Sequence, residues 1–150
     1  MTRLEIEGIV MSFNVRFNEK AFVKFAEEFE DAVKAEQIIS QTEKVMVETA
    51  GNAVRVIKKL TPDGKTHALR RGWSAGHLKR VGKTTNVDIW NSVRYAPFVE
   101  FGHRMVVHGK TVGYQPGKFM MKRGINYVEK TFEREVGKVY NEELKKIMGD

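Results

Sequence analysis

An apolar repeat with the period of an α-helix runs from Ile38 to Leu60, and it restricts the fold more than any other feature of this 150-residue chain. Apolar or small residues recur at spacings of three and four, as expected for one buried face of a long helix. The segment Thr61–Gly64 (Thr-Pro-Asp-Gly) follows at once, and proline and glycine stop a helix. We therefore predict a helix over about residues 36–60, which can begin near Ala35 and be continuous with an earlier helix.

Alternating charged and apolar residues near the N-terminus indicate two short strands, over residues 4–7 and 12–17. Asn18 can then cap a helix, because its side-chain oxygen accepts a free backbone N–H of the first turn. Residues at helical spacing follow it and would form one buried stripe over roughly four turns. The residues of this stripe are Phe22, Phe25, Ala26, Phe29 and Val33.

The middle of the chain changes to the period of a β-strand. Residues 73–81 and 84–93 both have the pattern of strands, and the glycine and lysine between them are typical of a hairpin turn. We expect an antiparallel sheet over about residues 71–94, completed by an N-terminal strand and crossed by the long helix. Alternate residues of the second run would form one face: Val87, Ile89, Asn91 and Val93.

One or two helical turns are expected between Tyr95 and Phe101, because Pro97 suits the first turn of a helix. Aromatic side chains are frequent in and near this segment, and large aromatic residues usually bury most of their surface. We predict that Trp73, Tyr95, Phe98 and Phe101 are mostly buried and that they organise the junction between the sheet and the segment that follows.

Residues 102–117 contain four glycines and little regular pattern. We predict a long loop, within which a short ribbon can form around Met105–Val107 and Thr111–Tyr114. A loop of this length inside a small domain usually has a function or is disordered. From Lys118 the helical period returns and continues to the C-terminus. Its stripe consists of Tyr127 or Val128, Phe132, Val136, Val139 or Tyr140, Leu144 and Ile147.

These elements together predict an α+β fold, in which a long helix packs on a small antiparallel β-sheet, with a long glycine-rich loop and a C-terminal helix. A chain of this length suits one domain, so we expect a single domain over residues 1–150. Met120 and Met121 suit core packing, because methionine fills irregular gaps.

Composition excludes several classes of protein. The chain has no cysteine, which rules out disulfides and thiolate metal sites. It has no apolar run long enough to cross a bilayer, and residues 1–7 alternate charged and apolar side chains instead of forming the apolar core of a signal peptide. We therefore expect a protein that is made inside the cell and has no membrane partner.

A net charge of +7 favours acidic partners, among them nucleic acid. In one segment cations alternate with ring side chains, an arrangement that can stack bases and pair phosphates. The residues of this segment are Arg70, Arg71, Trp73, His77, Lys79 and Arg80. The other interpretation is a solvated strand face with one core tryptophan. A basic nucleic-acid-binding protein is therefore the alternative function.

No set of residues has the spacing of a known catalytic, cofactor or metal site. His103 and His108 share the glycine-rich segment, but no HExxH or similar spacing accompanies them. Glu100 and His103 could form an acid–base pair, yet no nucleophile or oxyanion hole goes with them. Ser74 and Ser92 lack a nucleophile-elbow sequence. We expect no enzyme activity, no cofactor and no metal.

The segment 91–104, Asn-Ser-Val-Arg-Tyr-Ala-Pro-Phe-Val-Glu-Phe-Gly-His-Arg, is too specific in composition to be an ordinary loop. It follows Lys59–Gly64 and Leu69–Trp73 and precedes Pro116–Met121. In this order the segments resemble the tail-component family of long-tailed bacteriophages and prophages, over roughly residues 45–130. These are tail-completion or head–tail joining proteins. The chain departs from the family where members usually carry an Asp-Thr-Gly-type turn, since it reads Asp-Gly-Lys-Thr-His-Ala there.

The resemblance implies a structural role in phage assembly. Family members complete the tail at its head-proximal end, form a ring that is expected to be a hexamer, and dock onto the head connector. The implied partners are further copies of the chain, the head connector or adaptor, and the tail-tube protein, with packaged DNA nearby. The implied location is the head–tail interface of the virion, after synthesis in the bacterial host cytoplasm.

The glycine-rich segment 102–117 is the predicted assembly element, ordered best when its neighbours are present. Ordering a flexible segment costs about 1–2 kcal/mol of backbone entropy per residue, so a contact surface of good quality must offset this cost. The predicted interface residues are Arg104, Met105, Val106, Val107 and His108. The other interpretation is a mobile surface loop without a role.

Overall fold

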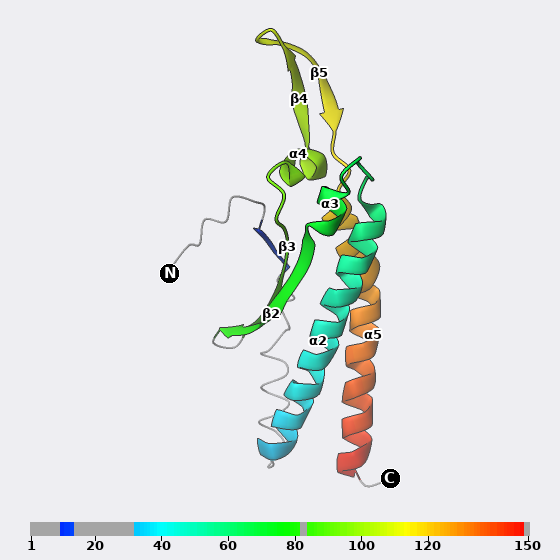
Figure 1. Cartoon of the computed structure of the whole chain (residues 1–150). Coiled ribbons are helices and arrows are strands. Elements are labelled where there is room, and N and C mark those ends of the chain that lie inside the picture. Colours follow the sequence, from blue (N-terminus) through cyan, green and yellow to red (C-terminus); the bar gives the residue numbers. More distant parts are fainter. Residues whose placement is uncertain (1–9, 14–31, 82–83, 149–150) are drawn as a thin grey trace.

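The computed structural model describes residues 10–13, 32–81 and 84–148. Two long helices and two small antiparallel sheets make up this part of the chain (Figure 1). The elements in chain order are β1 (Val10–Phe13), α2 (Ala32–Leu60), α3 (Ala68–Arg71), β2 (Trp73–Val81), β3 (Thr84–Asn91), α4 (Ala96–Phe101), β4 (Gly102–Val107), β5 (Lys110–Pro116) and α5 (Met120–Met148).

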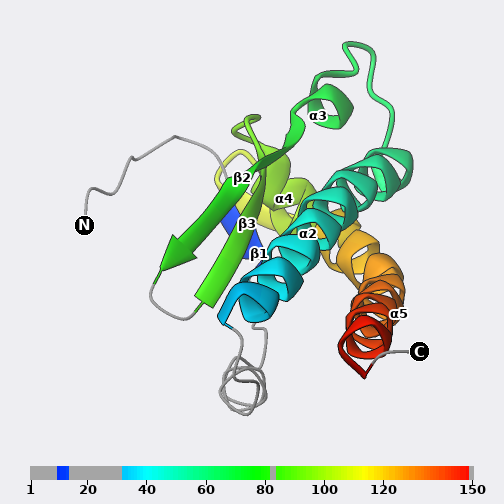
Figure 2. The same ribbon diagram turned by 90° about the horizontal axis from the view of Figure 1, so that it is seen from below.

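The arrangement confirms the predicted α+β class. β1, β3 and β2 form a three-stranded sheet in this order, and β4 and β5 form a separate two-stranded sheet. α2 lies between the three-stranded sheet and α5, and α5 runs antiparallel to α2 (Figures 1 and 2). The predicted long helix, small antiparallel sheet and C-terminal helix are therefore all present.

The predicted long helix is α2, whose described residues Ala32–Leu60 include the whole predicted range 36–60. The predicted continuity with an earlier helix lies outside the described residues. α2 ends at Leu60, where Thr61 Oγ1 donates to the Ile57 carbonyl oxygen at 2.7 Å. Pro62 has no N–H to continue the helix. The apolar repeat forms one buried stripe along the helix: Ile38, Thr42, Met46, Thr49, Ala50, Ala53, Val54 and Ile57.

The predicted hairpin in the middle of the chain is confirmed. β2 pairs with β3 from Trp73↔Asn91 to Val81↔Thr84, with a register shift between Ala75 and Leu78. β1 adds an antiparallel strand on the other side of β3. The face predicted from alternation is turned to the core, since Val87, Ile89 and Asn91 are buried.

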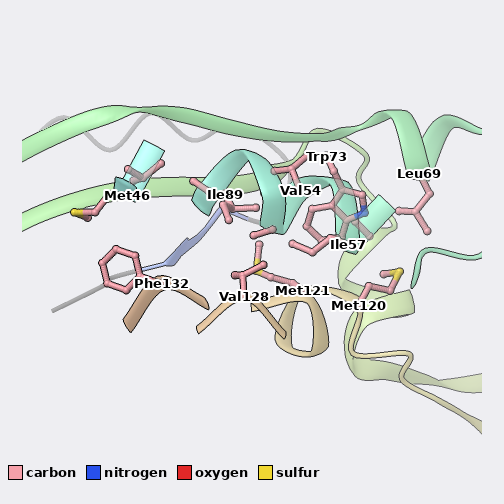
Figure 3. Packing of buried hydrophobic residues seen from close by; sticks show 14 of the residues in the cluster. Met46, Val54, Ile57, Leu69, Trp73, Ile89, Met120, Met121, Val128 and Phe132 are labelled. Atoms are coloured by element: carbon pink, nitrogen blue, oxygen red, sulfur yellow. The ribbon is translucent and has the colours of Figure 1, made fainter. Parts of the chain in front are cut away.

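The main core lies where α2 meets both the sheet and α5 (Figure 3). α5 contributes Val128, Phe132 and Val136 to this core, and Tyr140 packs against it, so the predicted stripe is confirmed up to Tyr140. Val128 is its buried member, whereas Tyr127 is exposed. The side chains of the last two predicted members, Leu144 and Ile147, lie outside the described part. Met120 and Met121 at the start of α5 are almost fully buried, as expected for core methionines.

Two predicted elements near the N-terminus lie outside the described residues. These are the strand over residues 4–7 and the helix capped by Asn18. The predicted strand over residues 12–17 overlaps β1 at Ser12 and Phe13, and its remaining residues also lie outside the described part.

Residues 102–117 form the hairpin β4–β5 and not the predicted long loop. The short ribbon predicted around Met105–Val107 and Thr111–Tyr114 is present, and it extends further in both directions than expected. The alternation of side chains that indicates a strand is hard to recognise in this sequence. Glycines lie at the base and in the turn of the hairpin, and the pairing of the strands is irregular. Met105 is opposite Gly113 and Val106 is opposite Thr111, which leaves Val112 as an extra residue on β5. A bulge of this kind shifts the period-2 pattern by one residue.

Candidate assembly surface

The hairpin β4–β5 projects from one end of the molecule, beyond α4 (Figure 1). Its strands pair from Gly102↔Pro116 to Val107↔Lys110. His108 and Gly109 connect them with φ angles of 50° and 77°, the positive values that both central residues of a type I′ turn adopt. Such a turn matches the twist of the strands, so the hairpin is a regular ribbon to its tip.

The base of the hairpin is fixed by close backbone packing. Gly102 has a φ of 83°, and a Cβ at this position would lie 2.5 Å from the carbonyl oxygen of Gln115. A Cβ at Gly117 would overlap the carbonyl oxygen of Glu100. Glycine is needed at both positions because each backbone passes so close to another. The two ends of the hairpin are therefore held against the last turn of α4.

Glu100 connects this base to the start of α5. Its side chain is fully buried, and its carboxylate oxygens accept the backbone N–H groups of Met121 and Lys122 at 3.1 and 3.3 Å. Its carbonyl oxygen accepts the N–H of Phe119 at 3.0 Å. A carboxylate here satisfies free N–H groups of the helix and interacts favourably with the positive end of the helix dipole. The orientation of the hairpin is thus coupled to the helical body.

The predicted interface residues all lie on this hairpin. Arg104 and His108 are exposed, and the apolar side chains of Met105, Val106 and Val107 have 41%, 54% and 51% of their surface accessible. Sequence reasoning missed their counterparts on β5, where Val112 and Tyr114 are also exposed and apolar. The pairing of the strands places these β5 residues beside the predicted ones, since Arg104 is directly opposite Tyr114. The signal in the sequence was the alternation of Val112 and Tyr114 with glycine between them.

Both faces of the ribbon carry apolar side chains. Residues directly opposite in an antiparallel pair share a face. Val106 lies beside Thr111 on one face, whereas Val107 lies beside Lys110 on the other. Met105 covers Gly113, since a Cβ on that glycine would lie 2.7 Å from the Met105 methyl carbon. A two-stranded ribbon is at most marginally stable alone in water, so a partner that covers these side chains would stabilise it.

The prediction that four aromatic residues are buried is correct for Trp73 alone, which is 1% exposed. Tyr95, Phe98 and Phe101 have 47%, 55% and 48% of their surface accessible. The short helix α4 explains the difference, because its buried residues, Ala96 and Glu100, are four apart and so occupy one face. Phe98 and Phe101 consequently point away from the core.

These aromatic side chains extend the exposed apolar surface from the hairpin to its base. The Phe98 ring meets the His103 ring edge to face, with centroids 5.9 Å apart. The Tyr114 hydroxyl donates to the Phe101 carbonyl oxygen at 2.9 Å, which ties β5 to α4. Phe119, just before α5, is exposed as well. Exposed apolar residues that gather at one end of a molecule are typical of an interaction site.

Positive charge is concentrated at the same end of the molecule. Residues 57–72 and 92–123, which we call the hairpin end, carry 11 lysines and arginines and only two acidic residues, Asp63 and Glu100. The rest of the chain has 15 basic and 17 acidic residues. The excess of positive charge therefore arises at the hairpin end, where the end of α2, α3, α4, the hairpin and the start of α5 meet (Figure 1).

Neither of the two carboxylates at the hairpin end neutralises the positive charge at the surface of the hairpin. Glu100 is buried under α5. Asp63 binds His67 and, at 2.9 Å, Arg70. The hydrogen bond from His67, with the Arg70 charge, lowers the pKa of Asp63 and keeps this carboxylate ionised within its own cluster. The cations on and beside the hairpin, such as Arg104 and Lys110, are left to attract an acidic partner.

The basic segment that suggested nucleic-acid binding is largely engaged within the molecule. Arg70 also donates to the Thr61 carbonyl oxygen at 3.1 Å, and Arg71 to that of Thr66 at 2.6 Å. The remaining contacts of the segment tie β2 to its neighbours: Lys79 pairs with Asp88 at 2.8 Å, Arg80 pairs with Glu43 of α2, and buried Trp73 donates to Thr61 Oγ1 at 2.9 Å. The interpretation as a strand face with one core tryptophan agrees with these contacts.

The possible catalytic pair is not assembled. The Glu100 carboxylate faces the start of α5, whereas His103 Nδ1 lies 3.4 Å from the Phe98 carbonyl oxygen. Within the described residues, no three histidine, aspartate or glutamate side chains gather in a way that could hold a metal ion. None of the described helices combines the length and apolar character that a membrane crossing needs.

A second surface lies on the body, between α2 and β2. An open groove there has an apolar part, Val47 and Leu78, and acidic groups, Glu43 and Glu48. Val47 is exposed in spite of its position on the long helix. The groove, which we call the α2–β2 groove, is lined by Ser40, Glu43, Lys44, Val47, Glu48 and Leu78.

Comparison with known proteins gives one family. The family model described as "Bacteriophage HK97-gp10, putative tail-component" matches residues 18–102. No curated protein and no solved structure matches the chain. The matched region contains α2, α3, β2, β3 and α4 and stops at Gly102, where the hairpin begins. The hairpin and α5 lie outside it, so their roles have to be argued from their geometry.

Proposed function

Because the chain belongs to the HK97-gp10-like family of bacteriophage tail components, we propose that it completes the tail at its head-proximal end and joins it to the head connector. A tail component is a structural protein of the virion, and its task is to bind other virion proteins. We propose no catalytic role. The proposed partners are further copies of the chain in a ring, expected to be a hexamer, the head connector or adaptor, and the tail-tube protein.

The observation that carries this proposal is the projecting hairpin. It exposes apolar residues on both faces, yet its base is fixed through Gly102, Gly117 and Glu100. A preformed ribbon loses less entropy on docking than a flexible loop would. The predicted assembly residues Arg104–His108 therefore lie on an element suited to insertion between neighbouring subunits.

The hairpin tip can be removed without disturbing the body. Met105 and Gly113 are directly opposite, so residues 106–112 can be replaced by the two-residue turn Asn-Gly. We expect the shortened protein to keep the melting temperature of the wild type, because the tip has no buried side chain. In a phage that carries this variant, filled heads and free tails should accumulate unjoined, as counted by electron microscopy and infectious titre.

A matched control is Tyr127→Ser, which changes an exposed aromatic residue of α5 outside the hairpin. This phage should assemble normally. Normal titres from the phage with the shortened hairpin would overturn the proposal that the hairpin tip, with Val106, Val107 and His108, is part of an assembly surface.

Direct nucleic-acid binding is the second candidate, and its support is the excess of positive charge at the hairpin end. Such a charge could also lie near packaged DNA in the assembled particle. The exposed valines of the hairpin favour a protein partner, because aliphatic side chains add nothing to binding through phosphates.

A further inference from the structure

We propose that the hairpin of one copy docks in the α2–β2 groove of the next copy, and that this contact builds the ring. The inference rests on the proposed function, because it identifies the partner of the assembly surface. The contact joins two different patches of the same chain. A heterologous contact of this kind generates a closed ring when the rotation between neighbours closes.

The two patches lie apart on the molecule, as a head-to-tail contact requires. The hairpin projects beyond α4 at one end, whereas residues 40–48 lie around the middle of α2, away from that end (Figure 1). The hairpin of one copy therefore cannot occupy the groove of the same copy. A second copy can present the hairpin while its own groove stays open for a third.

The apolar parts of the two patches are complementary. The hairpin tip exposes Val106, Val107 and Val112. The groove has an apolar part as well, in which Val47 of α2 is exposed and Leu78 of β2 is partly buried against the core. Docking would remove the apolar side chains of both patches from water at once, the main favourable term in protein association.

The charges of the two patches are also complementary. Arg104 and Lys110 lie on the hairpin, in the part of the chain that carries the positive excess. Glu43 and Glu48 line the groove, with Lys44 as the only basic residue among its lining residues. Glu43 already pairs with Arg80 of β2, which holds the groove walls together. Glu48 is the carboxylate that best suits a cation of the incoming hairpin.

Two other arrangements fit less well. Contact between two hairpins would bring two strongly positive ends together, and like charges opposed across an interface are unfavourable. A DNA partner would use the cations but would leave the valines of the tip exposed to water. The groove of a neighbouring copy can contact both the cations and the valines of the hairpin.

Cysteine cross-linking tests the contact directly, because the chain has no native cysteine. We expect the double variant Val107→Cys/Val47→Cys to form a ladder of disulfide-linked oligomers on mild oxidation, ending at a closed ring. Each single variant should stay uncross-linked. Val107→Cys/Tyr127→Cys is the control, since Tyr127 is exposed on α5 outside both patches, and it should give no ladder.

Charge exchange adds a second readout. Lys110→Glu in the double-cysteine variant should reduce the yield of cross-linked oligomers severalfold, and Glu48→Lys in the same chain should restore it. The inference is overturned if the double-cysteine variant stays monomeric at high protein concentration, if Val107→Cys alone gives dimers, or if the Tyr127 control cross-links equally well.

The outcomes separate this inference from the proposed function. If no hairpin–groove cross-link forms but the shortened hairpin still blocks the joining of heads and tails, the hairpin binds another virion protein and only the inference fails. If the cross-link forms and the phage with the shortened hairpin remains fully infectious, the contact exists but the proposed role of the hairpin in joining is wrong.

Discussion

At the scale of single residues, buried polar groups hold the ends of the secondary structures together. Thr61 donates to α2 and accepts the indole N–H of Trp73, so one hydroxyl joins the end of the long helix to the start of β2. Asn91 plays a similar part at the end of β3, because its side-chain amide donates to the Leu69 carbonyl oxygen at 2.8 Å. An unsatisfied buried group would cost about 1–3 kcal/mol, which explains why these polar residues occupy core positions.

Two aromatic substitutions should therefore differ strongly in their effect. Trp73→Ala removes a fully buried side chain and should lower the free energy of unfolding by about 3–5 kcal/mol. Phe98→Ala removes a half-exposed side chain with an edge contact to His103, and should lower it by about 1 kcal/mol or less. Urea unfolding followed by circular dichroism measures both. A loss for Phe98→Ala as large as that for Trp73→Ala would mean that α4 buries its aromatic face.

At the scale of elements, the close approach of α2 and α5 depends on a glycine. Gly124 of α5 is buried against Ile57, and a Cβ at this position would overlap the Ile57 side chain and lie 3.3 Å from its backbone nitrogen. Because the contact involves the backbone of α2, a change of side-chain rotamer alone cannot relieve it. The helices would have to move apart.

The effect of alanine should consequently have opposite signs at two glycines of α5. Gly124→Ala should destabilise the protein by about 1–3 kcal/mol through overpacking. Gly137→Ala meets nothing within 4 Å and should stabilise it by up to about 1 kcal/mol, because alanine has the higher helix propensity. Thermal unfolding measures both variants. If Gly124→Ala also raised the melting temperature, α5 would not pack as closely on α2 as the structure places it.

At the scale of the whole molecule, charge and apolar exposure coincide at one end. The hairpin end carries an excess of nine positive charges, more than the net +7 of the entire chain. The same end carries the exposed hairpin and the exposed aromatic residues of α4. Charge at such a surface accelerates encounter with an acidic partner, whereas apolar contact holds the complex together.

The dependence of binding on salt concentration should therefore distinguish protein contacts from DNA contacts. We expect duplex DNA to bind the protein at low salt and to be released at about 0.2 M salt, because binding through phosphates falls steeply with salt. Self-association through the hairpin should persist under the same conditions. Fluorescence anisotropy with labelled DNA, beside sedimentation of the protein alone, measures the two. DNA binding that survives high salt while self-association is lost would favour the nucleic-acid alternative.

Regular period and turn chemistry were enough to determine much of the fold from the sequence. Four elements could be predicted because each of them buries one face: α2, the hairpin β2–β3, α4 and α5. An element with one buried face has apolar residues at a regular period, and this period can be recognised in the local sequence. The family resemblance was carried by ordered segments between Lys59 and Met121. Those up to Gly102 lie within the region that the family match covers, whereas Pro116–Met121 lies outside it.

Tertiary structure alone decided which surfaces are free. The hairpin β4–β5 was predicted as a loop because glycines required by close backbone approach at Gly102 and Gly117 resemble glycines of a flexible segment. The exposure of Phe98 and Phe101 depends on which face α4 turns to the core, and that face is chosen by Ala96 and the contact of Glu100 with α5. The concentration of charge arises because segments distant in sequence fold to one end. Each of these outcomes depends on contacts between residues far apart in the chain. A local sequence pattern does not indicate such contacts.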